Sequence, residues 1–479
     1  MVLDKEGRAT LVAWLLGYSA LNALRSNDLG TAKKLLGEME WSLSSLKPGD
    51  AFFYHHLRTL ESLAGGDLKE AALHAELALK FSTDVGTPSG LGLSKLARAH
   101  VMHALGENRE AAEALSEALG IARQIRSKSS EYYGLMADAL FALDRGEEAT
   151  CLEILRRALA IGKESECFTT YIPPPSAMVR LCERALEAGI EVDYVQDLIR
   201  KHNLIPEKPP FHIENWPWPL KIYTLGHFEL VRDGQPIQFS RKIQQKPLSL
   251  LKVLIALGGR EVKEEQIADI LWPEAEGDAA HHAFVSALHR LRQLVGYEKA
   301  LALREGKLTM DNRYFWVDAW ALEYIWRQAE AQRKEGQIGM NVQMSEKTIE
   351  MYRGSFLGGE SEEPWMVSLR ERLRSKYLSC VNRLGQHWLQ LGNGEKAIEC
   401  YQRGLDVDDL AEEFYQGLML CYQRLNRETE ARAVYHRCRK TLSSALGIEP
   451  SAKTEAIYES IMKKVIVPGQ MARTSQKLN

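Results

Sequence analysis

Residues 391–405 read LGNGEKAIECYQRGL, and residues 425–439 read LNRETEARAVYHRCR. The segments align without gaps at an offset of 34 residues, and the matched positions are Leu391 with Leu425, Ala397 with Ala431, and Tyr401 with Tyr435. An alanine followed four positions later by a tyrosine lies on one helical face, where the small residue lets a second helix approach and the ring fills the gap to the next repeat. The pattern predicts tandem antiparallel helical hairpins.

A second array is predicted at the other end of the chain. GDLKEAALHAELAL (66–79) matches GENREAAEALSEAL (106–119) at an offset of 40 residues, and related segments stand at 27–36 and 144–159. The 34-residue period is that of tetratricopeptide (TPR) repeats, and the 40-residue period indicates a looser helical-hairpin array. Such arrays expose a concave groove that suits a small molecule, a peptide or a partner protein, and the alternative is a scaffold without a ligand.

Between the arrays, IPEKPPFHIENWPWP (205–219) is too rich in proline to be helical. We predict a stiff extended linker there, with Trp216 and Trp218 docked on a neighbouring surface. The pattern changes after it. KIYTLGHFELVRDGQPIQF (221–239) is β-rich and contains Asp233-Gly234, a hairpin turn signal.

Three helical segments follow these strands. The first, KPLSLLKVLIALGG, has Pro247 in its first turn, and the second, KEEQIADILW, is closed by Pro273. The third is HHAFVSALHRLRQLVG (281–296), which Asp278 is placed to cap. After them, residues 300–318 are predicted to form two strands around a basic, polar tip. Strands, three helices and a hairpin are the order of a winged helix-turn-helix domain.

The third segment divides into two faces. At 100° per residue, one stripe collects its large apolar residues, which are Phe284, Leu288, Leu291 and Val295, with Ala287 and Leu294 beside it. The opposite face collects His282, Ser286, His289, Arg290 and Gln293, without a carboxylate. A helix that lies against phosphates and base edges has to exclude carboxylates, so this face predicts contact with DNA. A solvated helix of accidental composition is the alternative.

Charge supports this prediction through its distribution only. The chain holds 61 Lys and Arg against 64 Asp and Glu, a formal net charge of -3, so any attraction for a polyanion has to be local. Most acids of residues 220–318 lie between 261 and 278, whereas Arg241, Lys242 and Lys246 lie elsewhere. The acidic run is either solvated charge or a docking surface for a basic protein.

Several function classes are not indicated. The seven cysteines are scattered and never spaced as C-x-x-C, which favours free thiols in a reducing cytoplasm over disulfides or a zinc site. The apolar run at 9–24 is too short and too polar for a membrane span, and we predict a buried helix there. Adjacent His281 and His282 point about 100° apart on a helix and do not suit a metal. We expect no enzyme, cofactor or membrane partner.

The chain resembles a known regulator family. LGHFELVRDGQPIQF, LLKVLIALGGREVKEEQIADILWPE, HRLRQLVG and GKLTMDNRYFWVD look like an OmpR-type winged helix. Residues 352–461, with the series YRGSFL, PW, LRERL and ALGIEPS, resemble the bacterial transcriptional activator domain. Their pairing over residues 220 to about 463 is similar to SARP-family regulators, and the first 200 residues resemble MalT-like TPR repeats.

The resemblance implies a mainly α chain with a small α/β domain between two TPR-like α-solenoids. The expected segments are 1–204 (repeats), 205–219 (linker), 220–318 (winged helix), 319–465 (activator domain) and 466–479 (flexible tail). The activator domain should pack directly on the winged helix, and we assign Trp365, Tyr401 and Tyr435 to repeat packing. The array before the winged helix departs from the usual SARP order, so sensing is expected to be built in. Gly162-Lys163 and Gly306-Lys307 lack the rest of a P-loop, so no ATP-driven switch is indicated.

Carried onto this sequence, the family mechanism assigns DNA contacts to eight residues, which are His282, Ser286, His289, Arg290, Arg292, Gln293, and, near the wing tip, Lys307 and Arg313. Arg290 is the best candidate for direct readout of guanine, whereas Arg292 could instead form a surface salt bridge. The resemblance implies promoter DNA and RNA polymerase as partners. It implies a cytoplasmic transcription regulator and favours an activator over a repressor. A homodimer is compatible with the repeats. The competing reading is a TPR interaction scaffold whose winged helix docks protein.

Overall fold

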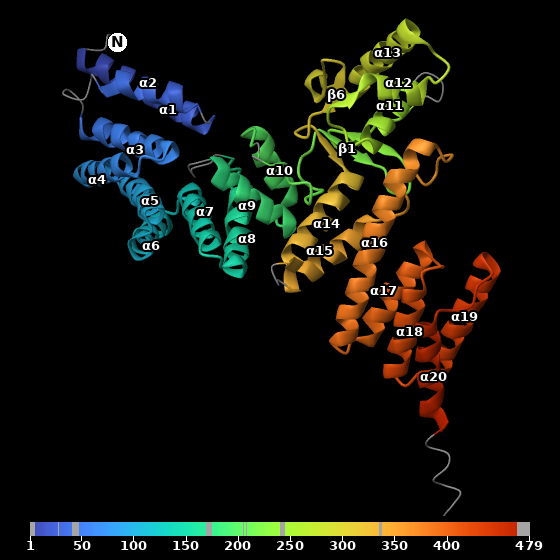
Figure 1. Cartoon of the computed structure of the whole chain (residues 1–479). Helices are drawn as coiled ribbons and strands as arrows, with labels where there is room; N and C mark the ends of the chain where they lie inside the picture. Colours follow the sequence, from blue (N-terminus) through green and yellow to red (C-terminus); the bar gives the residue numbers. More distant parts are fainter. Residues whose placement is uncertain are drawn as a thin grey trace, which may run out of the picture. The chain divides into compact units, whose positions relative to one another are not determined.

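The computed structural model describes residues 5–26, 28–40, 47–168, 175–204, 206, 208–239, 245–334 and 338–466. The chain divides into two compact units, Met1–Pro217 and Trp218–Asn479. Figure 1 shows helical hairpins in the first unit and, in the second, helices around small sheets. The predicted fold class, α-solenoid with a small α/β domain, is confirmed. The finer boundaries at 204, 219, 318 and 465 stay predictions, and the predicted tail beyond Ile466 lies outside the described residues.

The first unit is built from consecutive helical hairpins. Its described helices are α1 (Lys5–Arg25), α2 (Leu29–Glu40), α3 (Pro48–Gly65), α4 (Leu68–Val85), α5 (Pro88–Leu105), α6 (Asn108–Gln124), α7 (Lys128–Asp144), α8 (Glu148–Glu164), α9 (Pro175–Glu187) and α10 (Val192–Lys201). Gly66, Gly106 and Gly146 have φ of 79°, 83° and 78°. Gly66 and Gly106 cap the C-terminal ends of α3 and α5, and Gly146 lies in the turn that follows α7. Glycine adopts this left-handed conformation without strain, so the predicted 40-residue period is a period of chain reversals.

Small residues repeat at intervals of 39 or 40 residues inside the hairpins. Ala32, Ala71, Ala111 and Cys151 occupy equivalent positions of α2, α4, α6 and α8, and each is at most 1% exposed. A small side chain at this position lets the second helix of a hairpin approach the first closely. The sequence match between these segments therefore has a packing cause.

Helix α1 differs from the prediction of a buried helix. Ala13 and Ala20 are fully buried, but Leu11, Leu15 and Tyr18 on the opposite side are 50%, 60% and 53% exposed. α1 packs on α2 and α3, and these neighbours cover only one of its two apolar faces. Among the described helices, none has the length and apolarity that crossing a membrane requires.

The proline-rich segment 205–219 is non-helical where it is described, as predicted, but it is not extended. Its chain makes two turns, and the Nδ2 group of Asn215 donates a hydrogen bond to the carbonyl of Leu186 at 3.1 Å. Trp216 and Trp218 are 5% and 4% exposed, so their predicted burial is confirmed. The turns arise because proline restricts the backbone without forbidding a reversal.

Two small sheets begin the second unit. Their strands are β1 (Leu220–Tyr223), β2 (Glu229–Arg232), β3 (Gln235–Pro236), β4 (Val262–Lys263), β5 (Leu301–Arg304), β6 (Lys307–Met310) and β7 (Phe315–Val317). One sheet has the order β3-β2-β1-β7, with β1 parallel to β7 and antiparallel to β2, and the other has the order β4-β6-β5. The Asp233-Gly234 turn is confirmed, with φ of 50° and 79°. The prediction of two strands at 300–318 is wrong, because a third strand, β7, leaves the hairpin and pairs with β1.

Three helices lie along the chain between β3 and β5, with β4 between the first two. They are α11 (Gln245–Ala256), α12 (Glu264–Leu271) and α13 (Gly277–Val295), and the 3-10 turn η2 (Glu298–Ala300) follows α13. Pro247 lies in the first turn of α11, as predicted. Asp278 does not cap α13, because the helix begins at Gly277 and Glu276 holds the N-cap position. The carboxylate of Asp278 instead lies in the first turn, where the helix dipole favours a negative charge.

The remaining described helices are α14 (Asp318–Lys334), α15 (Ile338–Met351), α16 (Pro364–Gln390), α17 (Gly394–Val407), α18 (Glu412–Arg424), α19 (Glu428–Leu446) and α20 (Ala452–Ile466). Tyr401 on α17 is 2% exposed and Tyr435 is 5% exposed, whereas Trp365 is partly buried against the same core. A Cβ added at Gly385 or Gly417 would lie 2.6 or 2.5 Å from the Tyr401 ring. The tyrosine therefore fills the gap between α16 and α18, which confirms its predicted packing role.

A buried carboxylate joins the winged-helix segment to the helices after it. Asp318, at the start of α14, is 4% exposed and accepts hydrogen bonds from the backbone N–H groups of Thr224 and Leu225 at 2.8 Å. On the other side of this loop, the N–H of Leu357 donates to the carbonyl of Thr224 at 2.7 Å, and Leu225 forms a β-bridge with Phe356. The segment after β1 is thus held from both directions.

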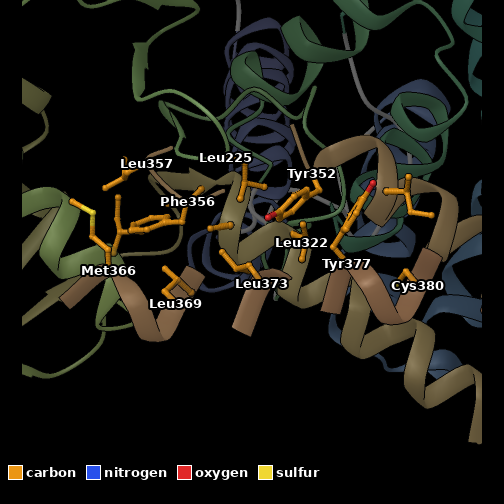
Figure 2. Packing of buried hydrophobic residues seen from close by; sticks show 14 of the residues in the cluster. Leu225, Leu322, Tyr352, Phe356, Leu357, Met366, Leu369, Leu373, Tyr377 and Cys380 are labelled. Carbon is orange, nitrogen blue, oxygen red and sulfur yellow. The ribbon is translucent and has the colours of Figure 1, made fainter. Parts of the chain in front are cut away.

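Figure 2 shows the apolar side of this joint. Leu225 and Leu322 lie among residues of the YRGSFL segment and α16, which include Tyr352, Phe356, Leu357, Met366, Leu369, Leu373, Tyr377 and Cys380. The rings of Tyr352 and Tyr377 stack with centroids 4.4 Å apart. The activator segment therefore packs on the winged-helix segment through one continuous core, as predicted.

Candidate nucleic-acid interface

Helix α13 is amphipathic in the structure as well as in the sequence. Phe284, Leu288, Leu291 and Val295 are at most 2% exposed and Ala287 is 4% exposed, all within the core of the second unit. α11 and α12 pack on this face. The helix ends at Gly296, whose φ of 77° allows its N–H to reach the carbonyl of Arg292. The predicted apolar stripe is confirmed.

The opposite face of α13 is open to solvent. His282, Ser286, His289, Arg290 and Gln293 are all exposed, and no carboxylate occurs in the helix after Asp278. The Nε2 atoms of Gln293 and His289 lie 3.1 Å apart and share a hydrogen bond. Arg290 has no hydrogen bond or ion pair within the described ranges. Its guanidinium donors are therefore available to a ligand.

Arg292 forms hydrogen bonds within the domain. This differs from both sequence predictions, a DNA contact and a surface salt bridge. Its Nη2 and Nε groups donate to the carbonyl of Leu301 at 2.9 and 3.2 Å. This contact fastens α13 to β5, and the side chain is half-buried. Arg292 fits a positioning role rather than a DNA contact or a surface salt bridge.

Arg313 is also placed differently from the prediction. It lies in the turn between β6 and β7, at the end of β6 away from the hairpin tip, and its guanidinium binds Asp311 with Nη2 to Oδ2 at 2.6 Å. This ion pair lowers the pKa of Asp311. The sequence could not reveal the difference because the end of β6 was unknown.

The hairpin of β5 and β6 has its tip at Glu305-Gly306, where φ is 49° and 69°. Lys307 begins β6 directly after the tip, which agrees with its predicted position, and its contact with DNA stays a prediction. Arg304 and Lys263 stand opposite Lys307 on the two neighbouring strands. Directly opposed residues of antiparallel strands project to the same face, so these three form a cation row across the sheet.

The cation row is unusual because like charges directly opposite one another destabilise a sheet. Lys263, Arg304 and Lys307 are exposed, and none has an ion-pair partner in the described part of the chain. A polyanion would relieve their mutual repulsion. Lys263 and Arg304 cannot be identified from the sequence, since only the strand register aligns them with Lys307.

One acid links the hairpin tip to the start of α13. The backbone N–H of Glu264 donates to the carbonyl of Gly306 at 2.8 Å, and its Oε1 lies 2.5 Å from Nδ1 of His281. The N-terminal turns of α13 and the wing tip therefore border the same residue of α12. This arrangement brings the exposed α13 face and the cation row to one part of the domain.

An exposed apolar residue completes the α13 face. Val285 is 42% exposed and lies three residues from His282 and four from His289, on the same side of the helix. An apolar group at such a place can contact the methyl group of thymine. Helical periodicity does not mark Val285 as a contact, because it is a single apolar residue on the polar face.

The other basic and acidic residues named from the sequence have varied roles. Lys246 donates to the carbonyl of Leu271 at 2.8 Å, which makes it structural, and Arg241 and Lys242 lie outside the described residues. In the acidic run the side chain of Glu264 is 16% exposed. The exposed carboxylates of the run belong to Glu261, Glu265, Asp269, Glu274, Glu276 and Asp278.

Comparison with known proteins gives the chain a family context. The family described as "Bacterial transcriptional activator domain" matches residues 317–462. Regulatory protein AfsR of Streptomyces coelicolor is 24% identical over 253 residues, which are 51% of this chain and 24% of AfsR. Transcriptional regulatory protein MoaR1 of Mycobacterium tuberculosis is 21% identical over 142 residues, 30% of this chain and 46% of MoaR1. The chain thus spans less than half the length of these curated relatives.

Solved structures resemble the chain more distantly. Mycobacterium tuberculosis EmbR in complex with a low-affinity phosphopeptide has a TM-score of 0.44 at 18% identity, covering 51% of this chain and 65% of EmbR. The apo form of RapI has a TM-score of 0.31 at 12% identity, covering 71% of this chain and 97% of RapI. The activator-domain match and the curated relatives show that the chain is similar to SARP-family transcriptional regulators, and its helical hairpins are TPR-like.

Proposed function

We propose that this chain is a sequence-specific DNA-binding regulator, in which the exposed face of α13 enters the major groove and the cation row contacts phosphates. The observation that carries the proposal is the acid-free face of α13 with an uncommitted Arg290 at its centre. A helix with this face fits a groove lined by phosphates, whereas a partner protein would not require every carboxylate to be absent. Base readout is assigned to His282, Val285, Ser286, Arg290 and Gln293, with His289 holding Gln293 in place.

The proposal extends to activation and sensing. Six exposed carboxylates of the acidic run offer a surface for basic regions of RNA polymerase, the partner that the family resemblance implies. The first unit, built from hairpins that expose a groove, would sense an effector or partner. Direct packing of the activator segment on the winged-helix segment supports a mechanism in which both act as one body.

Replacing Arg290 by alanine is expected to weaken binding to the promoter upstream of the chain's own gene. A bidentate contact between arginine and guanine contributes about 1–3 kcal/mol, so the Kd should rise by roughly 5- to 150-fold. Gel shifts or fluorescence anisotropy with the promoter and with a scrambled duplex would measure this. The loss should be larger for the promoter than for the scrambled duplex.

Arg313→Ala is the matched control, because Arg313 is an exposed arginine of the same domain already bound to Asp311. It should leave the Kd almost unchanged. Equal affinities of the Arg290→Ala variant and the unmodified chain would remove α13 from the interface. In that case a protein-docking role of the winged-helix segment would gain support.

Neutralising the cation row is expected to weaken binding to every duplex alike. Lys263→Gln, Arg304→Gln and Lys307→Gln should each reduce the slope of log affinity against log salt by about 1, because each removes one phosphate contact. Lys299→Gln, an exposed lysine on η2, is the control and should not change the slope. The triple variant should unfold at a urea concentration no lower than the unmodified chain, since like-charge repulsion is removed. An unchanged salt slope in the triple variant would assign the row no contact with DNA.

A further inference from the structure

A cavity opens in the first unit, far along the sequence from α13. Its volume is about 360 Å³, and its lining comes from α3, α5, α7 and α9, the first helices of four consecutive hairpins. Small-molecule sites in proteins occupy about 300–1,000 Å³ and combine apolar walls with a few polar groups. The size and position of this cavity therefore suit a small ligand bound along the inner face of the array.

Three charged or polar side chains from three helices meet in the cavity wall. Asp144 on α7 binds Arg180 on α9, with Oδ1 to Nη1 at 2.8 Å, and its Oδ2 lies 2.9 Å from Nε2 of His103 on α5. Partial burial raises the pKa of Asp144, but the hydrogen bonds from His103 and Arg180 outweigh it and hold the pKa below its usual value. The carboxylate is thus ionised, and both of its oxygens are engaged.

The wall holds hydrogen-bond donors that a ligand can reach. The imidazole of His103 stacks on Phe141 with centroids 4.0 Å apart, and burial lowers the pKa of neighbouring His100 to about 4, which keeps it neutral. Arg180 uses one of its five N–H groups on Asp144, and 48% of its side chain is exposed. Its other N–H groups and the exposed hydroxyl of Ser176 can donate to a ligand.

The rest of the wall is apolar. Leu63, Ala104, Leu140 and Ala177 complete the lining without adding a charge. A ligand that satisfies Arg180 needs acceptor oxygens in a plane, and a carboxylate matches the planar guanidinium through two parallel hydrogen bonds. An apolar body would then lie against the leucine and alanine side chains.

We propose that this cavity binds a small carboxylate with an apolar body, held by Arg180, which Asp144 and His103 orient. The inference rests on the proposed function in one respect: it names the chemical class of the effector that the first unit senses. Because Asp144 bridges α5 and α9 through His103 and Arg180, a bound carboxylate would act on the contacts between successive hairpins. The binding itself does not depend on DNA.

The test uses the full chain and para-fluorobenzoate as the probe, followed by ¹⁹F NMR line broadening. We expect saturable binding, with para-fluorobenzamide and para-fluorobenzylamine binding at least tenfold more weakly. The amide keeps the ring and loses the charge, whereas the amine reverses the charge. Absence of saturable binding below about 10 mM, which corresponds to roughly 3 kcal/mol, would overturn the proposal, as would tighter binding of the amine.

Arg180→Gln should weaken probe binding at least tenfold. Arg184→Gln, one turn further along α9 and paired with Glu148 and Glu187, is the matched control and should bind like the unmodified chain. Circular dichroism melts identify a variant that fails to fold, and Arg180→Lys then provides a second comparison that keeps the charge but loses the bidentate geometry. Equal probe binding by Arg180→Gln would overturn the proposal. Promoter affinity is measured on the same samples, so a chain that binds DNA but not the probe loses only the carboxylate assignment.

Discussion

Replacing Asp318 with alanine is expected to destabilise the second unit by about 3–5 kcal/mol, because a buried network loses its common acceptor. The carboxylate accepts from the backbone N–H groups of Thr224, Leu225 and Ala319 and from the hydroxyl of Thr224, at 2.6–2.8 Å. Thr224 is fully buried and Leu225 is 2% exposed, so water cannot replace the missing oxygens. Burial raises the pKa of Asp318, and these hydrogen bonds act in the opposite direction.

Urea unfolding of the full chain, with hydrogen exchange of peptides from residues 218–466 as the readout, measures the loss. Asp269→Ala removes an exposed carboxylate of α12 and is the control, with an expected change below about 0.5 kcal/mol. Asp318→Asn keeps one acceptor oxygen and should fall between the two. Promoter binding should weaken in proportion to the unfolded fraction, since no DNA contact is assigned to Asp318. A midpoint equal to that of the control would show that the joint does not depend on this carboxylate.

Features that depend on local sequence were predictable. The apolar stripe of α13 follows from helical periodicity alone, and Phe284 and Leu291 are fully buried where the wheel places them. The Asp233-Gly234 turn follows from the residues that tolerate positive φ. The match of Tyr401 with Tyr435 predicted packing, although only the structure shows Gly385 and Gly417 on either side of the first ring.

Features that depend on distant partners were not predictable. Arg290, Arg292 and Arg313 look alike in the sequence, yet one is unpaired in the described ranges, one binds the Leu301 carbonyl and one binds Asp311. The pairing of β7 with β1 joins residues about 95 positions apart, so the periodicity of the sequence cannot predict it. The cation row depends in the same way on register, because Lys263 reaches Lys307 only through β4 and β6. A single sequence indicates which side chains can be exposed, but it does not show which of them already form hydrogen bonds or ion pairs within the domain.

Acidification from pH 7.5 to pH 5 is expected to destabilise the first unit more than the second. His55, His56, His74 and His100 all lie in the first unit, and burial lowers the pKa of each from 6.5 to about 4. Unfolded histidine gains a proton near pH 6.5, whereas the folded side chains stay neutral until about pH 4. The stability that these residues contribute is therefore complete above pH 6.5 and is lost as the pH falls towards 4.

The size of the effect follows from the two most deeply buried rings. His56 and His100 are each 5% exposed, and at pH 5 each should cost about 2 kcal/mol, because one pKa unit corresponds to about 1.4 kcal/mol. His55 and His74 add to this cost, since their Nδ1 atoms share one hydrogen bond at 2.9 Å that cannot survive when both rings are charged. Burial raises the pKa of Asp138 and Glu183 in the same unit, which opposes the loss. Four histidines with a folded-state pKa of about 4 are set against two acids, so acidification is expected to destabilise the first unit on balance.

Urea unfolding at pH 7.5, 6 and 5, followed by a pulse of hydrogen exchange at one fixed pH, separates the two units in the intact chain. Peptides from residues 47–168 should lose protection at progressively lower urea as the pH falls, and peptides from 218–466 should shift less. A His56→Gln, His100→Gln double variant is expected to be less stable at pH 7.5 yet to show a shallower pH dependence, because two neutral side chains no longer titrate. A double variant with the same pH dependence as the unmodified chain would assign the acid sensitivity to other groups. Equal shifts of the two units would show that the buried histidines do not control the stability of the repeat array.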